Sequence, residues 1–212
     1  DSPMSRGLGD VYKRQGIGKV IDSNNPEYKT GDLTFGLIGW QTHCLTKPNV
    51  DDRFRVVPDL LPIPTMLNVM GSTGITAYYG LVELGKPKSG ETVLVSGAAG
   101  ATGSVVVQIA KLKGCHVIGI AGGKEKCDWL KDIGVDDVID YKNSDVHKEL
   151  PKVVENGIDI YFDNVGGKIL ETVLELININ ARVLLCGGIS SGYDATRPVS
   201  YTHLRAHETS EN

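Results

Sequence analysis

The chain has 212 residues, of which 41% are hydrophobic and 23% charged, and its formal net charge is −4 at pH 7. This length can hold one large domain or two small ones. The acidic balance argues against a nucleic-acid binder with a broad basic face. No apolar run approaches the roughly 18 residues that a membrane span needs. We therefore expect a globular protein with neither a nucleic-acid nor a membrane partner.

The first and last segments differ from the middle of the chain. Residues 1–15 show no hydrophobic period and no helix cap, and residues 199–212 turn polar where the preceding pattern should continue. Strings such as DVYKRQ and SYTHLRAHE resemble translated adapter sequence, so we expect both flanks to be non-native. The alternative interpretation is an ordinary disordered terminus.

Residues 16–65 consist of short apolar runs between turn residues. GKVID is followed by a turn at residues 23–26, and Gly31-Asp32 precedes LTFGLIGW. This pattern predicts short antiparallel strands. Residues 66–85 then predict one helix or two, interrupted at Gly71 and Gly74.

From residue 91 onward, apolar strands alternate with amphipathic helices. The predicted strands are 91–96, 115–121, 137–141, 158–163 and 182–186, and the predicted helices are 101–113, 124–133, 145–155 and 167–178. This alternation predicts an α/β fold with a doubly wound parallel Rossmann sheet, in which five of the six usual strands are present. We assign residues 66–198 to this domain.

The first strand-to-helix turn reads SGAAGATG over residues 96–103. Compared with the G-x-G-x-x-G fingerprint, Ala98 occupies the first position, and Gly100 and Gly103 the second and third. Gly100 would let the backbone approach a pyrophosphate at the helix N-terminus, and Gly103 would let the helix pack close to the strand. Because the turn follows a strand and opens a helix, it predicts dinucleotide binding.

The end of the second strand bears on which dinucleotide binds. NAD enzymes usually place an Asp or Glu there, whereas this chain has AGGKEK over residues 121–126. Lys124 and Lys126 suit the 2′-phosphate of NADP better. Two alternatives stay open: Glu125 could bind a ribose, and the segment could be a solvated helix start.

Five stretches together resemble one known family. They are GITAYYGL (74–81), AAGATGSVVVQIAKLKGC (98–115), AGGKEKCDWL (121–130), YFDNVGG (161–167) and CGGISSGY (186–193). Over residues 16–197 the chain is similar to the zinc-independent, NADPH-dependent double-bond reductases of the medium-chain dehydrogenase/reductase superfamily. This branch includes prostaglandin, alkenal and curcumin reductases.

The resemblance implies a set of cofactor-binding residues. The pyrophosphate would lie on the turn formed by Gly100, Ala101, Thr102 and Gly103, and the 2′-phosphate would lie against Lys126. The adenosine would lie beside Tyr141 and Asn164. The last loop would pass beside the cofactor with Cys186, Gly187, Gly188, Ile189 and Ser190.

Two further residues are the catalytic candidates. The resemblance places Thr76 close to the nicotinamide. It also implies a tyrosine near the substrate, just after the Ile-Ser of the last loop; here Gly192 moves Tyr193 one position later.

The implied reaction is the NADPH-dependent reduction of the C=C bond of an α,β-unsaturated ketone or aldehyde. The hydride would go to the β-carbon and the enolate would be protonated, with no metal required. The four cysteines have no metal-like spacing, which agrees with reduced thiols in a cytoplasmic protein.

The same resemblance implies that residues 16–65 are the remnant of a GroES-like catalytic domain. It also implies that the Rossmann domain is incomplete at its C-terminal end, that the parent is a homodimer, and that this chain alone is inactive. Two alternative functions stay open: an NADPH:quinone reductase of the same superfamily, and a non-catalytic NADPH-binding module.

Overall fold

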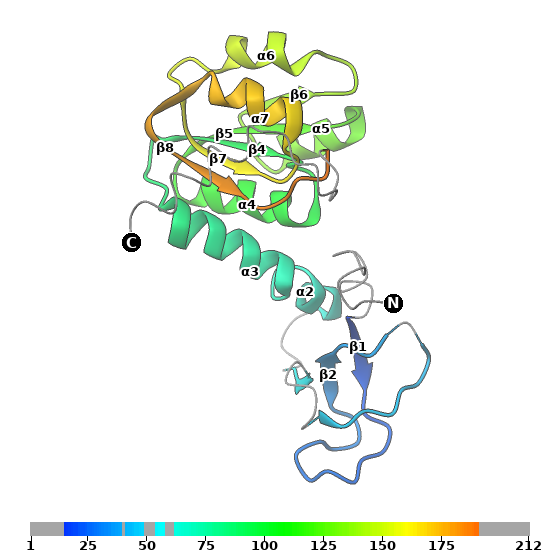
Figure 1. Cartoon of the computed structure of the whole chain (residues 1–212). Coiled ribbons are helices and arrows are strands. Elements are labelled where there is room, and N and C mark those ends of the chain that lie inside the picture. The colour runs from blue at the N-terminus through cyan, green and yellow to red at the C-terminus, as the bar shows by residue number, and fades with distance from the viewer. Residues whose placement is uncertain (1–14, 40, 49–53, 58–61, 191–212) are drawn as a thin grey trace, which may run out of the picture. The chain divides into compact units, whose positions relative to one another are not determined.

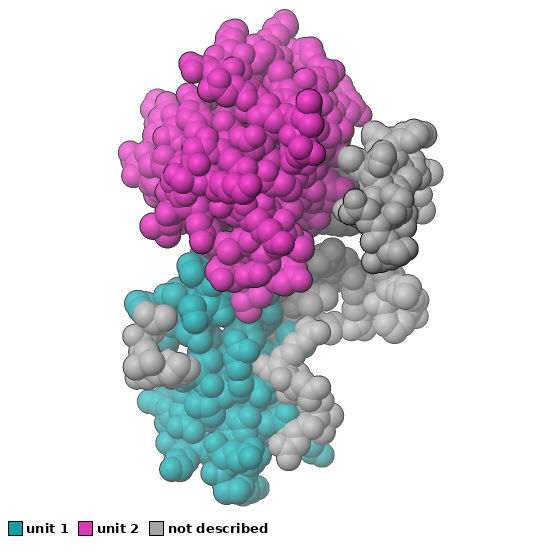
Figure 2. All heavy atoms as spheres, turned by 90° about the vertical axis from the view of Figure 1, so that its left-hand side faces the viewer, with its two compact units in different colours: residues 1–73 teal, residues 74–212 magenta. Residues whose placement is uncertain are grey.

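The computed structural model describes residues 15–39, 41–48, 54–57 and 62–190 (Figure 1). The chain divides into two compact units, one up to Thr73 and one from Gly74 onward (Figure 2). The expectations for the two flanks and for Tyr193 lie outside the described residues.

The first unit contains a three-stranded antiparallel sheet. Its strands are β1 (Gly16–Lys19), β2 (Leu33–Gly36) and β3 (Arg55–Val56), with β2 in the centre. Phe35 and Val57 pack with Met66 of helix α2 (Ile63–Leu67) in a small core. The short antiparallel strands predicted in this region are confirmed.

The predicted helical region after residue 66 is broken once. After α2 the chain continues into helix α3 (Ser72–Tyr78) and a π-helical segment, η3 (Tyr79–Gly85). The interruption at Gly71 is confirmed because this residue lies between α2 and α3. The interruption at Gly74 is wrong: Gly74 is buried inside α3, where tertiary packing overrides the low helix propensity of glycine.

The second unit is built on a five-stranded parallel sheet, as predicted. Its order is β6-β5-β4-β7-β8, formed by β4 (Thr92–Ser96), β5 (His116–Ala121), β6 (Asp137–Asp140), β7 (Ile158–Asp163) and β8 (Ile177–Leu185). The chain moves outward from β4 to β6, then returns to place β7 on the other side of β4. The switch point therefore lies between β4 and β7, which is where open α/β sheets bind ligands.

Helices cover both faces of this sheet. They are α4 (Ala101–Leu112), α5 (Lys124–Asp132), α6 (Val146–Val153) and α7 (Gly167–Leu174). Successive residues of β4 face opposite sides: Val93 belongs to the core that contains α4 and α5 residues, whereas Leu94 belongs to the core with α6 and α7 residues. Figure 1 shows α4 on one side of the sheet and α6 and α7 on the other. The doubly wound architecture is thus confirmed.

The boundary between the last helix and strand differs from the prediction. Helix α7 ends at Leu174, and β8 begins at Ile177 instead of residue 182. Ile177 pairs with Ile158 of β7, and the ladder is then irregular until Arg182 pairs with Ile160. Asn180, with φ 64°, lies inside the irregular part. Pairing with a distant strand therefore overrides the local helical pattern.

In the described part of the chain, no helix is both long enough and apolar enough to cross a lipid bilayer.

Candidate functional site

The predicted cofactor residues follow the carboxyl ends of the parallel strands. Because all five strands run the same way, their ends share one edge of the sheet. The turns after β4, β5, β6, β7 and β8 carry the segments that begin at Gly97, Gly122, Tyr141, Asn164 and Cys186. The fold therefore brings the predicted cofactor-binding residues to a single edge of the sheet.

The turn after β4 leaves the N-terminus of α4 open. Gly100 is the N-cap residue and provides no side-chain cap. Its N–H donates to the Gly97 carbonyl at 2.9 Å, while the N–H groups of the first helical turn have no acceptor within the helix. These N–H groups and the helix dipole favour an anion at this point.

Gly103 permits the close approach between α4 and this turn. A Cβ atom added at Gly103 would overlap the Gly97 carbonyl oxygen and lie 2.9 Å from the Cα of Ala98. Those atoms are backbone and cannot rotate away. The turn therefore has the shape that a pyrophosphate cradle needs.

The N-terminus of α7, at the other side of the switch point, is already filled. The side chain of Asp163 is fully buried, and its Oδ1 accepts hydrogen bonds from the N–H groups of Val165 and Gly166 at 3.0 and 2.8 Å. The Ser96 and Tyr161 hydroxyls donate to the same oxygen at 2.8 and 2.7 Å. Of these two helix termini, that of α4 is the one available to an anionic ligand.

Hydrogen bonds also fix the turn after β7 against that after β4. The Asn164 side-chain amide donates to the Ser96 carbonyl at 2.7 Å, and the Asn164 N–H donates to the Ser96 hydroxyl at 2.9 Å. The side chain of Asn164 is therefore held beside the β4 turn.

The turn after β8 is fixed against β7 in the same way. The N–H groups of Cys186 and Gly187 donate to the Asp163 carbonyl at 2.8 and 3.0 Å. The Ser190 hydroxyl and N–H donate to the Val165 carbonyl at 2.6 and 3.0 Å. The predicted loop 186–190 is consequently part of one bonded assembly with the predicted Asn164.

The turn after β5 carries the predicted 2′-phosphate residue. Gly123, the N-cap of α5, has φ 94°, and its N–H donates to Asp140 Oδ1 at 2.8 Å. This bond is the main reason that the pKa of Asp140 lies below its usual value. Lys126 is exposed on the first turn of α5. The Tyr141 ring lies against Gly122, where a Cβ atom would approach Tyr141 Cζ to 2.6 Å.

An apolar pocket of about 420 Å³ lies between the α3–η3 segment and the ends of β7 and β8. Its lining comprises Ile75, Thr76, Tyr79, Gly80, Leu84, Phe162, Leu184, Leu185 and Cys186. Two predicted residues, Thr76 and Cys186, therefore share one pocket. π-Helical turns such as η3 are frequent at functional sites.

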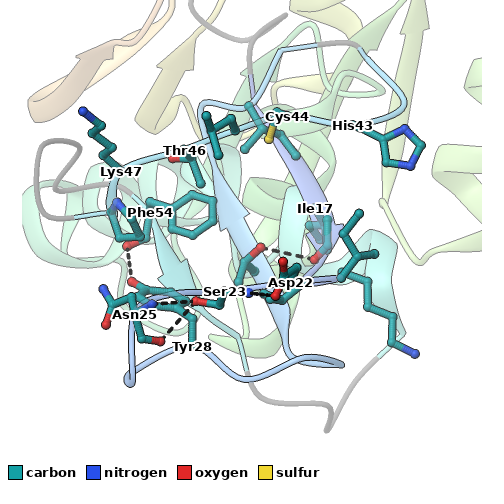
Figure 3. Close-up of a pocket in the computed structure, with 18 of the residues that line it drawn as sticks. Ile17, Asp22, Ser23, Asn25, Tyr28, His43, Cys44, Thr46, Lys47 and Phe54 are labelled. Carbon is teal, nitrogen blue, oxygen red and sulfur yellow. Dashed lines mark hydrogen bonds between the residues drawn. The ribbon is translucent and has the colours of Figure 1, made fainter.

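A larger hollow of about 930 Å³ lies in the first unit (Figure 3). Two of its polar side chains bond to nearby main chain: the Tyr28 hydroxyl donates to the Phe54 carbonyl at 3.3 Å, and the Ser23 hydroxyl to the Asn25 carbonyl at 3.1 Å. None of the predicted site residues lines it, so we assign the candidate site to the second unit.

Sequence reasoning gave no role to Ser96 and Asp163, which organise this edge. Their position offered a clue. Both are polar residues at the last place of an otherwise apolar, buried strand, and buried polar groups need hydrogen-bond partners. Across the described part of the chain, no three His, Cys, Asp or Glu residues are grouped so that they could hold a metal ion.

The chain is similar in sequence to two named reductases. NADPH-dependent curcumin reductase of Escherichia coli (strain K12) is 42% identical over 190 residues, which are 89% of this chain and 54% of that protein. Prostaglandin reductase 1 of Oryctolagus cuniculus is 43% identical over 190 residues, with the same coverage of 89% and 54%. The chain thus spans about half the length of these relatives. The resemblance to double-bond reductases noted from the sequence is confirmed.

A crystal structure of CurA from Vibrio vulnificus in complex with NADPH is also similar. The TM-score is 0.78 and the identity 44%, covering 90% of this chain and 58% of CurA. The zinc-binding dehydrogenase family matches residues 101–210, just over half of the chain. By this match the chain belongs to the zinc-binding dehydrogenase family.

Proposed function

We propose that this chain is the cofactor-binding part of an NADPH-dependent reductase that acts on the C=C bond of α,β-unsaturated ketones or aldehydes. The observation that carries the proposal is the open N-terminus of α4 at the switch point, behind the SGAAGATG turn. The names of the two reductases and the NADPH in the CurA structure support it.

The turn residues Gly100, Ala101, Thr102 and Gly103 would hold the pyrophosphate through backbone N–H groups. Lys126 would bind the 2′-phosphate. The exposed position of Lys126 supports this role, because its ammonium can reach a ligand without leaving a buried contact.

Tyr141 and Asn164 would border the adenosine side and its neighbourhood. The loop from Cys186 through Gly187, Gly188 and Ile189 to Ser190 would pass beside the cofactor. The hydrogen bonds that tie this loop to Val165 and Asp163 would keep that wall in a fixed position.

When bound, NADPH would supply a hydride to the β-carbon of the substrate. The residues of the chain would orient the reactants and exclude water. Thr76 would lie near the nicotinamide, and the apolar lining around it suits an uncharged enone or enal better than a charged substrate. Tyr193 would provide a hydroxyl near the substrate carbonyl, where negative charge develops.

The longer protein is proposed to be a cytoplasmic homodimer whose GroES-like domain includes residues 16–65 and whose Rossmann domain extends past residue 198. Because the chain spans about half the length of its relatives, we expect it to bind NADPH but not to reduce a substrate by itself. Sedimentation of the longer protein as a monomer at micromolar concentration would contradict the dimer.

A chimera tests the activity. The aligned segment of E. coli curcumin reductase would be replaced by the matching residues of this chain. NADPH oxidation would then be measured with an unsaturated ketone, an unsaturated aldehyde and a quinone. We expect turnover of the ketone or the aldehyde, with reduction of their C=C bonds. Turnover of the quinone alone would instead support a quinone reductase, and NADPH binding without turnover of any substrate would support a non-catalytic module.

A further inference from the structure

The carboxylate of Asp163 has very unequal surroundings at its two oxygens. Oδ1 accepts from two hydroxyls and two backbone N–H groups, all between 2.7 and 3.0 Å. Oδ2 is buried and has no hydrogen-bond partner among the described residues. The side chain is inaccessible to solvent. Burying a carboxylate destabilises the folded state unless the carboxylate is well hydrogen-bonded. We therefore expect Asp163 to have a role beyond packing.

The bonds of Asp163 reach all three turns that surround the switch point. Through Ser96 Oγ, the side chain contacts the end of β4, and the same hydroxyl accepts the Asn164 N–H. Through Val165 and Gly166, it fixes the start of α7. Through its own carbonyl, Asp163 holds the first two residues of the 186–190 loop. Through its side chain and its main-chain carbonyl, Asp163 thus joins the turn after β4, the start of α7 and the 186–190 loop.

We propose that Asp163 is a positioning residue for the cofactor: it does not touch NADPH but holds the β4 turn, Asn164 and the 186–190 loop in the arrangement that receives it. This inference rests on the proposed function. A site residue misplaced by about 1 Å can lose most of its effect, so loosening this junction should lower NADPH affinity even where the chain remains folded.

Asp159 provides a matched control on the same strand. It is four residues earlier on β7, and it also joins neighbouring segments: Oδ2 accepts the Thr92 N–H at 2.8 Å, and Oδ1 accepts from the Asn178 side chain at 2.8 Å. Thr92 begins β4, so these bonds lie at the opposite edge of the sheet from the predicted cofactor residues. Loss of Asp159 should weaken folding without changing the cofactor edge.

The experiment compares NADPH affinity, measured by fluorescence titration, in the wild-type 212-residue chain, Asp163→Ala, Asp163→Asn and Asp159→Ala. The temperature is chosen so that circular dichroism shows all four folded. Asp163→Ala should weaken binding about tenfold or more, because donors are left without an acceptor. Asp163→Asn retains an oxygen at the Oδ1 position and should recover most of the affinity. Asp159→Ala should bind like the wild type. Equal affinity of Asp163→Ala and wild type, or an equal loss in Asp159→Ala, would overturn the proposal.

A ligand-free measurement separates this inference from the proposed function. Hydrogen exchange followed by mass spectrometry should show faster exchange at residues 97–100 and 164–167 in Asp163→Ala, because these segments lose the bonds to the Asp163 side chain. Asp159→Ala should not show this change. If Asp163→Ala does not fold, Ser96→Ala, which removes the bridging hydroxyl, takes its place in both measurements. Failure of the wild-type chain to bind NADPH would contradict the proposed cofactor. Unchanged exchange in both segments would overturn the positioning role, whatever the wild type binds.

Discussion

On the first turns of α5, the Lys124 ammonium is paired with the Asp128 carboxylate one helical turn further on. This pairing raises the pKa of Lys124. Lys126 is also exposed, but over the stretches that the structure describes it forms no ion pair. The two lysines that could bind a 2′-phosphate are therefore not equivalent. Among the described residues, Lys124 has a carboxylate partner and Lys126 has none.

Lys126→Ala should lower the affinity for NADPH and leave that for NADH nearly unchanged. A charge-assisted contact to a phosphate contributes roughly 1.5–3 kcal/mol, which corresponds to about a ten- to 150-fold loss. The difference between the cofactors should shrink at high salt, because screening weakens exposed charge pairs. Fluorescence titration of both cofactors measures it.

Lys124→Ala is the matched control for this prediction, since it removes an equal charge two residues away. Its own partner is Asp128, and exposed pairs of this kind contribute little. We expect much less effect on NADPH than from Lys126→Ala. Equal weakening of NADPH and NADH by Lys126→Ala would remove Lys126 from the site, as would no change in either.

Gly103→Ala should mainly lower the stability of the fold, whereas Gly100→Ala should mainly weaken NADPH binding. At Gly103 the new methyl group meets backbone of the β4 turn, so the fold should lose about 1–3 kcal/mol. At Gly100, φ is −78° and the nearest atom, the Gly97 carbonyl oxygen, would lie 3.1 Å from the new Cβ, so the loss of stability should be smaller than at Gly103. The Gly100 methyl would instead stand where the pyrophosphate approaches and should weaken NADPH. Urea unfolding and NADPH titration of both variants test this, and equal stability losses would contradict it.

The alternation of strands and helices was predictable because short stretches of sequence determine it. Buried parallel strands such as β4 and β7 appear in the sequence as short apolar runs, and the glycine turn after β4 lies between a strand and a helix. The start of β8 was not predictable in the same way. Ile177 is a strand residue because it pairs with Ile158, nineteen residues earlier in the chain, and the local sequence does not contain that pairing.

The site shows the same division. The turn at Gly100 and Gly103 was found because a spacing motif marks it. The Ser96–Asp163 bond joins residues 67 positions apart, so only the sheet order brings them together. The sequence placed Asp163 at a strand end but could not show that four donors meet on one of its oxygens.

The rate at which each cysteine is alkylated should depend on the solvent exposure of its thiol and on the pKa of that thiol. Cys44 is exposed, whereas Cys115 and Cys127 are buried, and desolvation raises the pKa of both buried thiols. Since the thiolate is the reactive form, iodoacetamide near neutral pH should label Cys44 well before the buried pair, as followed by peptide mass spectrometry. Labelling in denaturant, where all sites should react alike, is the control. Early labelling of Cys115 or Cys127 would show that the core opens readily.

Cys186 offers a related test of the Asp163 charge. Desolvation raises the pKa of the Cys186 thiol, and the nearby Asp163 carboxylate raises it further. Asp163→Asn removes this charge, so it should lower the pKa of Cys186 and speed its alkylation. Cys44 in the same sample serves as the internal reference. An unchanged ratio of the two labelling rates would contradict an effect of the Asp163 carboxylate on the Cys186 thiol.

The ion pair between Glu91 and Arg182 should make folding stability depend on pH. Arg182 Nη1 and Nη2 donate to the two Glu91 carboxylate oxygens at 3.0 and 2.5 Å, and Nε donates to the Gly85 carbonyl at 2.9 Å. This pair joins β8 to the residue preceding β4 and to the end of η3. The hydrogen bonds from Arg182 are the main cause that holds the pKa of Glu91 below its usual value of 4.5.

A carboxylate with a lowered folded-state pKa stabilises the fold above its unfolded pKa, and this contribution is lost as pH falls through the folded value. The wild type should therefore lose stability below about pH 4.5. Glu91→Gln should be less stable at pH 7, where hydrogen bonds to charged groups contribute roughly 1.5–3 kcal/mol, and should show a weaker pH dependence. Asp136 and Asp140 also have lowered pKa values, but they titrate in both variants. The difference between the two urea-unfolding curves from pH 7 to pH 3.5 thus isolates Glu91. A constant difference over that range would show that the Glu91 carboxylate has the same pKa in the folded and unfolded chains.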